Sequence, residues 1–177
     1  MQIFPKNNIW NTPVDSLPVH PQSDAWLTLV GTAAKLRCDD QMPVNFLSGP
    51  TPLVSVSGMA SPDTDAGGGP ITATSVIEGG SGPGLPGPAN TDSHFIAVDQ
   101  SGILYEIDGL FGAPGSWVGY SGAKWDLGSN ALRTDSYTSA DAGGLPILPG
   151  LLKYDEVLVE VTHALRFTAP HTQGLGV

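Results

Sequence analysis

Six acidic residues lie inside or directly beside apolar, strand-like runs, where a carboxylate is expected to be paired or chemically active. They are Glu78, Asp92, Asp99, Glu106, Asp126 and Asp141. A glycosidase needs one carboxylic acid held protonated and one carboxylate held ionised across a cleft. Glu78 precedes a Gly-rich loop and Asp126 follows a tryptophan, so these two are the predicted catalytic pair. The alternative for each is a solvated strand end or a turn-forming acid.

The Asp92-Ser-His94 sequence adds a second chemical possibility. In an extended chain, side chains two residues apart point the same way, so Asp92 and His94 would act together. Asp92 and His94 are predicted to orient the catalytic carboxylates or to shift their pKa values. With His171 they could instead hold a divalent cation in a metal-dependent enzyme. A structural hydrogen bond that fixes the imidazole is the third alternative, and His163 is expected to be a hydrogen-bonded core residue.

Three large aromatic residues lie within nine positions of each other in a Gly/Ser-rich segment. Trp117, Tyr120 and Trp125 could stack on the apolar faces of sugar rings. Asp141 is predicted as a further substrate contact. These residues would also serve a glycan-binding module without catalytic activity. The alternative is that the aromatic rings fill the ends of a hydrophobic core.

Composition limits the partners. The 7 Lys and Arg residues against 17 Asp and Glu give a net charge of −10, so no positive surface for nucleic acid is expected. No apolar stretch approaches the ~20 residues that span a bilayer. The partner predicted here is a polysaccharide or oligosaccharide.

The single cysteine, Cys38, excludes an intrachain disulfide. The opening MQIFPKNNIW lacks the apolar core of a signal peptide. The low Lys content and abundant small polar residues nevertheless favour an extracellular, secreted protein.

The 23 Gly and 16 Pro residues favour a loop-rich fold of many short strands. Residues 1–22 carry four prolines and predict an extended arm. A helix is predicted over residues 24–30, with Ser23 as its N-cap and Gly31 at its end. Strands are predicted over residues 43–47, 53–57, 71–78, 94–99, 103–108, 117–127 and 157–168.

Two of these predictions rest on the clearest patterns. HFIAVD and ILYEID flank Gln100-Ser101-Gly102, which predicts a β-hairpin. Apolar and polar residues alternate over residues 157–168, which predicts a half-buried strand. We therefore expect an all-β, single-domain antiparallel β-sandwich or jelly-roll-like fold over residues 1–177, with one or two short helices.

The run SADAGGLPILPGLLKYDEV followed by HALRFT resembles a poorly characterised family of secreted bacterial β-rich proteins. Members carry SADAxGLPILPGLxxYDEV and then HALRFT, and the opening NIWNTPVDSLPVHPQSDA and the segment DSHFIAVD fit the same pattern. The resemblance implies an extracellular protein of environmental bacteria, often in a polysaccharide-degrading setting. It also implies that related chains continue beyond the HALRFTAPHT motif.

Overall fold

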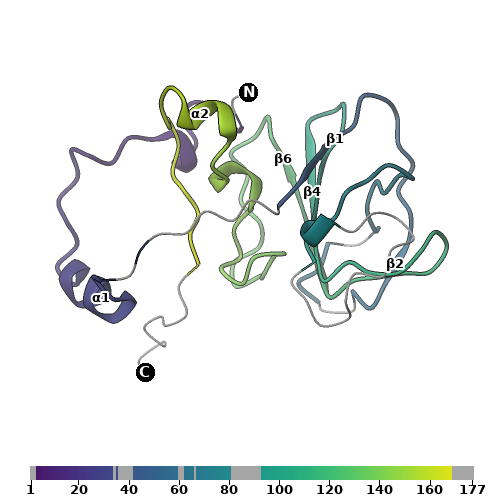
Figure 1. The fold of residues 1–177 in the computed structure, drawn as a ribbon, viewed down its shortest axis with the longest axis horizontal. Coiled ribbons are helices and arrows are strands. Elements are labelled where there is room, and N and C mark those ends of the chain that lie inside the picture. Colours follow the sequence, from purple (N-terminus) through teal and green to yellow (C-terminus); the bar gives the residue numbers. More distant parts are fainter. Residues whose placement is uncertain are drawn as a thin grey trace.

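A computed structural model describes residues 3–33, 35, 42–59, 62–65, 67–80 and 93–168. Within these ranges the chain is a small β-rich domain with a few short helices (Figure 1). The strands are β1 (Val44–Phe46), β2 (Val56–Ser57), β3 (Phe95–Val98), β4 (Ile103–Asp108), β5 (Trp117–Val118) and β6 (Ser121–Asp126). The helices are η1 (Ile9–Asn11), α1 (Ser23–Val30), η2 (Glu78–Gly80), η3 (Leu148–Gly150) and α2 (Tyr154–Val157). No helix in these ranges has the length and apolar character needed to cross a bilayer.

Four strands form the main sheet, in the order β1-β3-β4-β6. The pairs β3–β4 and β4–β6 are antiparallel, whereas β1 runs parallel to β3. The short strands β2 and β5 form a separate parallel pair. The expectation of a purely antiparallel fold is therefore wrong for two pairings. A parallel pair arises because long connections, unlike a tight hairpin, can bring a strand back in the same direction. The sandwich or jelly-roll arrangement stays a prediction.

The β3–β4 hairpin is confirmed, and local chemistry explains its turn. Oδ1 of Asp99 accepts hydrogen bonds from the backbone amides of Ser101 and Ile103 at 2.9 and 3.0 Å. Gly102 then adopts a φ of 82°, a left-handed conformation that costs glycine little. Four residue pairs follow in antiparallel register, from Val98 opposite Leu104 to Phe95 opposite Ile107. The hairpin thus forms the two central strands of the main sheet.

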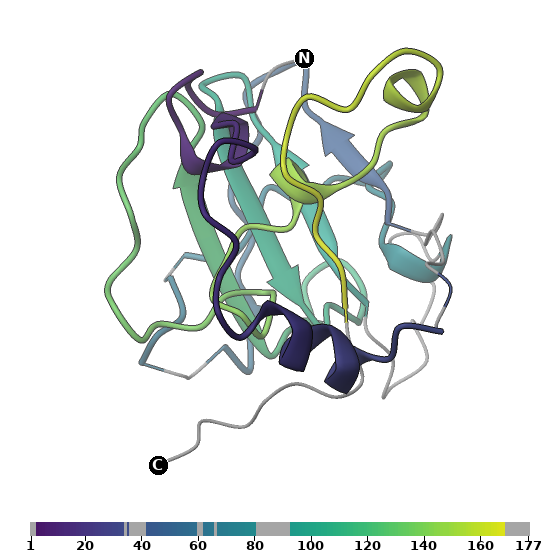
Figure 2. The same cartoon turned by 90° about the vertical axis from the view of Figure 1, so that its left-hand side faces the viewer.

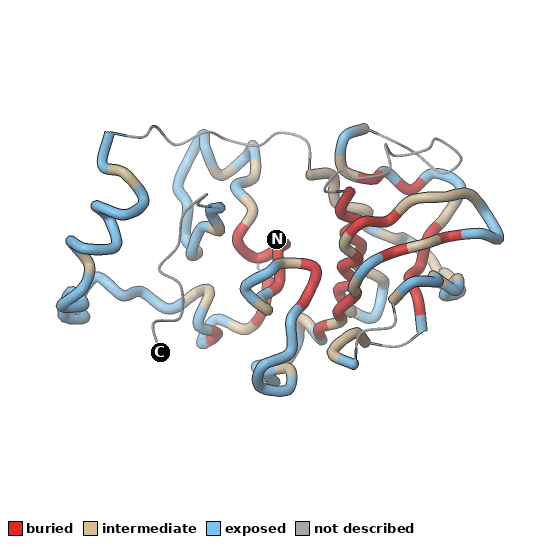
Figure 3. Tube along the Cα trace, turned by 90° about the horizontal axis from the view of Figure 1, so that it is seen from below, coloured by how far each residue is buried: buried red, intermediate tan, exposed pale blue. Residues whose placement is uncertain are grey.

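Side-chain alternation divides the main sheet into two faces. Leu104 and Glu106 point to one side together with Trp125, which we call the first face. Phe95 and Ile107 point to the other, the second face, where they pack with Trp117. The first-face core also contains Ile3 and Phe4 from the start of the described chain and Ile147 and Leu148 from the segment at η3. Figure 2 shows purple and yellow segments in front of the strands, and Figure 3 shows buried residues along the strands and on the segments to both sides of them.

The predicted strand over residues 157–168 is wrong. The helix α2 ends at Val157, the first residue of the predicted strand, and the following residues are irregular and largely exposed, with Val159 88% and Phe167 71% accessible. Isolated backbone bonds from Ala164 to Trp10 and from Arg166 to Gly150 replace a continuous ladder. Alternation describes how side chains are disposed, but a strand also needs a neighbour with matching backbone groups.

Three other predicted elements differ in detail. Residues 71–78 form no strand, because a turn at Thr72 and Ser75 interrupts them, with the Thr72 amide bonding to Ser75 Oγ at 2.9 Å. The predicted strand over residues 117–127 is split into β5 and β6. The helix α1 is confirmed and ends at Gly31, but Gln22 rather than Ser23 occupies its N-cap position.

Candidate functional site

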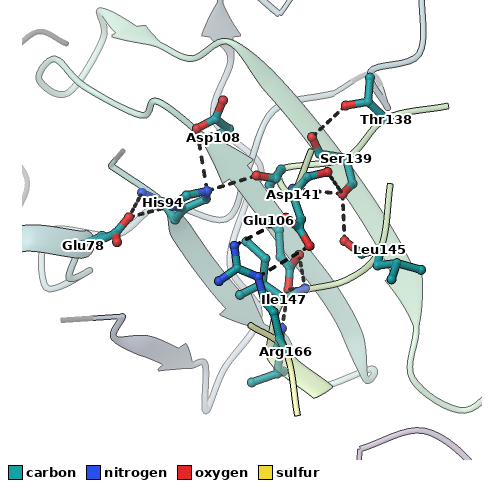
Figure 4. Close-up of polar contacts among 12 residues, drawn as sticks. Glu78, His94, Glu106, Asp108, Thr138, Ser139, Asp141, Leu145, Ile147 and Arg166 are labelled. Carbon is teal, nitrogen blue, oxygen red and sulfur yellow. Dashed lines mark hydrogen bonds and ion pairs between the residues drawn. The ribbon is translucent and has the colours of Figure 1, made fainter. Parts of the chain in front are cut away.

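Four acidic residues and one histidine gather at one end of the first face (Figure 4). We call Glu78, His94, Glu106, Asp108 and Asp141 the acid–histidine cluster. Glu78 begins η2, and His94 directly precedes β3. Glu106 and Asp108 share a face of β4 because they are two residues apart. Asp141 comes from the long segment between β6 and η3, so tertiary packing assembles the cluster from four segments.

His94 is held through both ring nitrogens. Its Nδ1 lies 2.6 Å from Glu78 Oε2, and the same oxygen accepts the His94 backbone amide at 3.0 Å. Its Nε2 lies 3.0 Å from the carbonyl oxygen of Ala140 and 3.7 Å from Asp108 Oδ1. Burial favours a lower pKa for His94, but the hydrogen bond and charge of Glu78, the Ala140 carbonyl and Asp108 together raise it above its ordinary value. Both nitrogens face acceptors, so the doubly protonated imidazolium satisfies this geometry.

Glu106 is fully buried in the middle of the sheet. Its carboxylate accepts the backbone amide of Ile147 at 2.9 and 3.0 Å and that of Leu148 at 2.9 Å. Burial raises the pKa of Glu106 to about 7, although the two amides and His94 act to lower it, and Asp141 adds to the rise. The side chain therefore fixes the start of η3 against β4.

Asp141 completes the cluster by pairing with Arg166. The two contacts, from Nε to Oδ2 and from Nη2 to Oδ1, are both 3.4 Å long. Ser139 braces the same segment, because its hydroxyl bonds to the carbonyl oxygens of Asp141 and Leu145 at 2.8 and 2.7 Å. Residues 139–148 are fastened to the sheet at both ends, because Ser121 Oγ of β6 donates to the Ser139 carbonyl at 2.9 Å and the Ile147 amide donates to Glu106 of β4.

The structure brings together only part of the predicted catalytic set. Glu78 and His94 are in contact, whereas Asp126 pairs with Ile103 at the opposite end of the β4–β6 ladder. Ile107 pairs with Phe95, the residue after His94, and it lies four residue steps along β4 from Ile103, or about 13 Å. Asp126 also points to the second face, and its carboxylate accepts the Gly128 amide at 2.8 Å as a turn-forming acid. Glu78 and Asp126 therefore do not face each other.

Two predicted ligands, Asp92 and His171, lie outside the described residues. Within the described ranges, no group of three or more His, Cys, Asp or Glu side chains is arranged to hold a metal ion. The divalent-cation site stays a prediction.

The three predicted sugar-stacking aromatics do not share a surface. Trp117 belongs to the second-face core and Trp125 to the first-face core, and both are largely buried. Tyr120 is 52% exposed and packs at a tilt against Phe111, with ring centroids 6.3 Å apart. The two tryptophans thus take the alternative role of filling the core, and Trp125 also borders an open space.

That space is a cavity of about 410 Å³, which we call the aromatic cavity. Phe4, Trp10, Trp125 and Tyr137 contribute its rings, and its polar groups include Asn8, Thr134 and Asp135. Residues 142–146 form one wall, which we call the cavity wall. The cavity wall lies between Ala140, which contacts His94, and Ile147, which contacts Glu106.

Arg133 organises the floor of the aromatic cavity. Its guanidinium lies 5.6 Å from the centre of the Trp125 ring and 5.8 Å from that of Tyr137. Its Nε donates to Asp65 Oδ2 at 3.1 Å and its Nη2 to the carbonyl oxygen of Asp63 at 2.7 Å. The cation therefore holds the aromatic rings in place and ties them to the loop around residue 64.

A second cavity of about 470 Å³ lies near α2. His163, expected in the core, lines it and is half-buried. Its Nε2 lies 3.1 Å from Glu156 Oε2, and Lys153 Nζ lies 2.6 Å from Glu156 Oε1. Despite an opposing effect of burial, these hydrogen bonds lower the pKa of Glu156 to about 2. The Glu156 carboxylate thus finds its hydrogen-bond partners in Lys153 and His163.

Sequence reasoning missed several of the residues that matter most. Glu106 has a usable signal, because it lies in the middle of an apolar strand, whereas the sequence pattern favours Asp126 beside a tryptophan. Asp108 lies two residues after Glu106 in the predicted strand over residues 103–108, a spacing that places both on one face, whereas Arg133 and Arg166 carry no distinguishing spacing. Trp10 falls within the predicted extended arm of residues 1–22, yet it lies in η1 and packs against the first-face core.

No family model, curated protein or solved structure matches this chain.

Proposed function

We propose that this protein is an extracellular glycan-binding module that holds a polysaccharide or oligosaccharide chain end in the aromatic cavity. The observation that carries the proposal is the meeting of Trp10, Trp125 and Tyr137 around one cavity with polar groups at its rim. Sugar rings offer flat apolar faces and a hydroxyl-rich edge, so rings plus hydrogen-bonding groups match their chemistry.

The exposed parts of the cavity fit a ligand of this kind. Tyr137 is 37% exposed and Trp10 is partly exposed, so their rings remain accessible to a ligand. Thr134 and Asp135 beside them are exposed and can bond to sugar hydroxyls. The chain's charge of −10 favours neutral over polyanionic glycans.

Binding is favoured over hydrolysis because of where the carboxylates lie. The predicted acid and nucleophile are on opposite faces, and neither cavity is lined by Glu78, His94 or Glu106. A two-carboxylate glycosidase needs both groups at one cleft, within about 5–10 Å. The same proposal includes the secreted setting implied by the sequence resemblance. It also includes a β-sandwich or jelly-roll arrangement of the strands.

The test combines binding with product analysis. Purified protein is incubated with insoluble cellulose, xylan, chitin and curdlan, and both pelleted protein and released reducing ends are measured. We expect retention on at least one glycan without release of sugar. Tyr137→Ala should weaken that retention about tenfold or more, from the loss of one stacking ring and its burial.

Tyr120→Ala is the matched control, because it removes an exposed tyrosine on a different part of the surface. Equal retention of both variants on the glycan would overturn the assignment of glycan binding to the aromatic cavity. Release of reducing ends that Glu78→Gln abolishes would restore the hydrolase hypothesis.

A further inference from the structure

Two described residues other than glycine adopt a left-handed backbone conformation, Phe4 with a φ of 64° and Ser136 with a φ of 67°. The other ten described residues with positive φ are glycines, for which this conformation costs little. A Cβ atom crowds the backbone there, so both residues are strained. Both also line the aromatic cavity. In a chain with 23 Gly residues, a larger residue at each position indicates that the side chain itself has a role.

The role of the Phe4 side chain is visible within the protein. Its ring is buried in the first-face core, with 7% of the residue exposed. The strain is considerable, because a residue that precedes a proline, here Pro5, favours an extended conformation. Asn11 Nδ2 donates to the carbonyl oxygens of Ile3 and Pro5 at 2.9 and 3.0 Å, so it holds the backbone on both sides of Phe4. Burial of the ring therefore offsets the strain.

The Ser136 side chain has no comparable role among the described residues. It is exposed, and its hydroxyl forms no hydrogen bond with any of them. Ser136 is the third residue of a turn that the Tyr137 amide closes on the Thr134 carbonyl at 3.1 Å, and glycine is usual at that position when φ is positive. In the β3–β4 turn, by contrast, Ser101 Oγ donates to Asp99 Oδ1 at 2.7 Å. The Ser136 hydroxyl is thus available to a ligand.

We propose that Ser136 is a sugar-binding residue of the aromatic cavity, and that its hydroxyl hydrogen-bonds to a hydroxyl group of the glycan whose ring stacks on Tyr137. This contact rests on the proposed function, because it lies at the same cavity. A serine hydroxyl both donates and accepts, so it pairs with a sugar hydroxyl in either role. The ionised carboxylate of Asp135 beside it only accepts. The two side chains therefore complement each other along the hydroxyl-rich edge of a sugar.

The surroundings of the turn keep the strained residue in place. Arg133 Nη1 donates to the Thr138 carbonyl oxygen and so joins the two flanks of the turn. The cavity wall packs against the turn, because a Cβ at Gly144 would lie 2.7 Å from the Tyr137 carbonyl oxygen. A strained conformation persists where the structure around it fixes both sides. The Ser136 hydroxyl is therefore held at the cavity before a ligand arrives, which lowers the entropic cost of binding.

The experiment compares Ser136→Gly with Ser136→Ala, because both variants remove the hydroxyl but only glycine relieves the strain. Depletion isotherms on cellulose, xylan, chitin and curdlan give the Kd, and thermal unfolding gives the melting temperature. We expect both variants to weaken binding about fivefold, from the loss of one hydrogen bond. The melting temperature of Ser136→Gly should rise by about 2 °C, whereas that of Ser136→Ala should stay within about 1 °C of the wild type. A purely structural role for Ser136 would instead move stability and binding in the same direction.

Ser116→Gly is the matched control. Ser116 is exposed in another turn, where its amide donates to the Ala113 carbonyl at 2.8 Å, and it neither has a positive φ nor lines the aromatic cavity. This variant should keep the wild-type Kd and should not raise the melting temperature. A wild-type Kd in Ser136→Ala, or no rise in the melting temperature of Ser136→Gly, would overturn the proposal. No retention of the wild type on any of the four glycans would contradict the proposed function and this contact together, whereas retention that Tyr137→Ala weakens and Ser136→Ala does not would contradict the contact alone.

Discussion

The carboxylate of Glu106 accepts the backbone amide of Ile147 at 2.9 Å, across 41 residues of sequence. This contact joins the centre of β4 to the segment that carries the cavity wall. It places an ionisable group where water does not reach, because Glu106 has no exposed surface. The stability of the fold is therefore linked to the proton on this side chain.

Replacing Glu106 with Gln should flatten the pH dependence of stability between about pH 4.5 and 7. The folded state raises the pKa of Glu106 from 4.5 to about 7, so it binds the proton more tightly than the unfolded chain. The free energy of unfolding of the wild type should fall as pH rises through this window, by about 3 kcal/mol in total. Urea denaturation at pH 4, 5, 6, 7 and 8 measures the slope. Glu160→Gln, at an exposed carboxylate, should keep the wild-type slope.

Replacing Glu78 with Gln should shift the titration of His94 to lower pH. The hydrogen bond and charge of Glu78 favour the imidazolium, and their loss leaves burial as the dominant influence. The His94 stabilisation, present below the imidazole's unfolded pKa and lost as pH rises through its folded pKa, should then shrink. NMR titration of the His94 ring follows the midpoint directly. Asp126→Asn should leave it unchanged, and an identical shift in both variants would contradict a specific Glu78–His94 contact.

Replacing Arg133 with Lys should destabilise the protein by about 2 kcal/mol, because an ammonium group cannot reproduce the planar fork. The fork bonds to Asp65, to the Asp63 carbonyl and to the Thr138 carbonyl. Chemical denaturation measures the loss. Arg166→Lys is the comparison, since its two contacts are longer, at 3.4 Å, and it should cost less than about 1 kcal/mol. An equal cost at both positions would show that the fork geometry is unimportant.

Two glycine substitutions should separate backbone strain from steric exclusion. Gly68 and Gly102 both adopt positive φ, but a Cβ at Gly68 would lie 1.9 Å from the Val54 carbonyl oxygen, whereas one at Gly102 meets nothing within 4 Å. Gly102→Ala should cost about 1 kcal/mol from strain alone. Gly68→Ala should cost several times more or prevent folding, as judged by thermal unfolding. Similar melting temperatures for the two variants would contradict the close approach of residues 54 and 68.

Parts of the fold could be predicted from sequence because their causes are local. The β3–β4 hairpin follows from two apolar runs and the turn chemistry of Asp99, Ser101 and Gly102. The helix α1 ends where Gly31 reaches a φ of 100°. By contrast, alternation over residues 157–168 predicted a strand, but no adjacent strand pairs with them among the described residues. Pairing depends on the rest of the chain, which a local pattern does not contain.

The sequence by itself determined that this is a β-rich, acidic chain with carboxylates set in apolar strands, because composition and alternation express directly which side chains avoid water. Only the tertiary structure decided which of those carboxylates meet. Glu78 reaches His94 across 16 residues and Glu106 reaches Leu148 across 42, whereas Asp126 faces away. The physical reason is that the energy of a buried charge depends on its neighbours in space, and strand order and loop packing choose those neighbours.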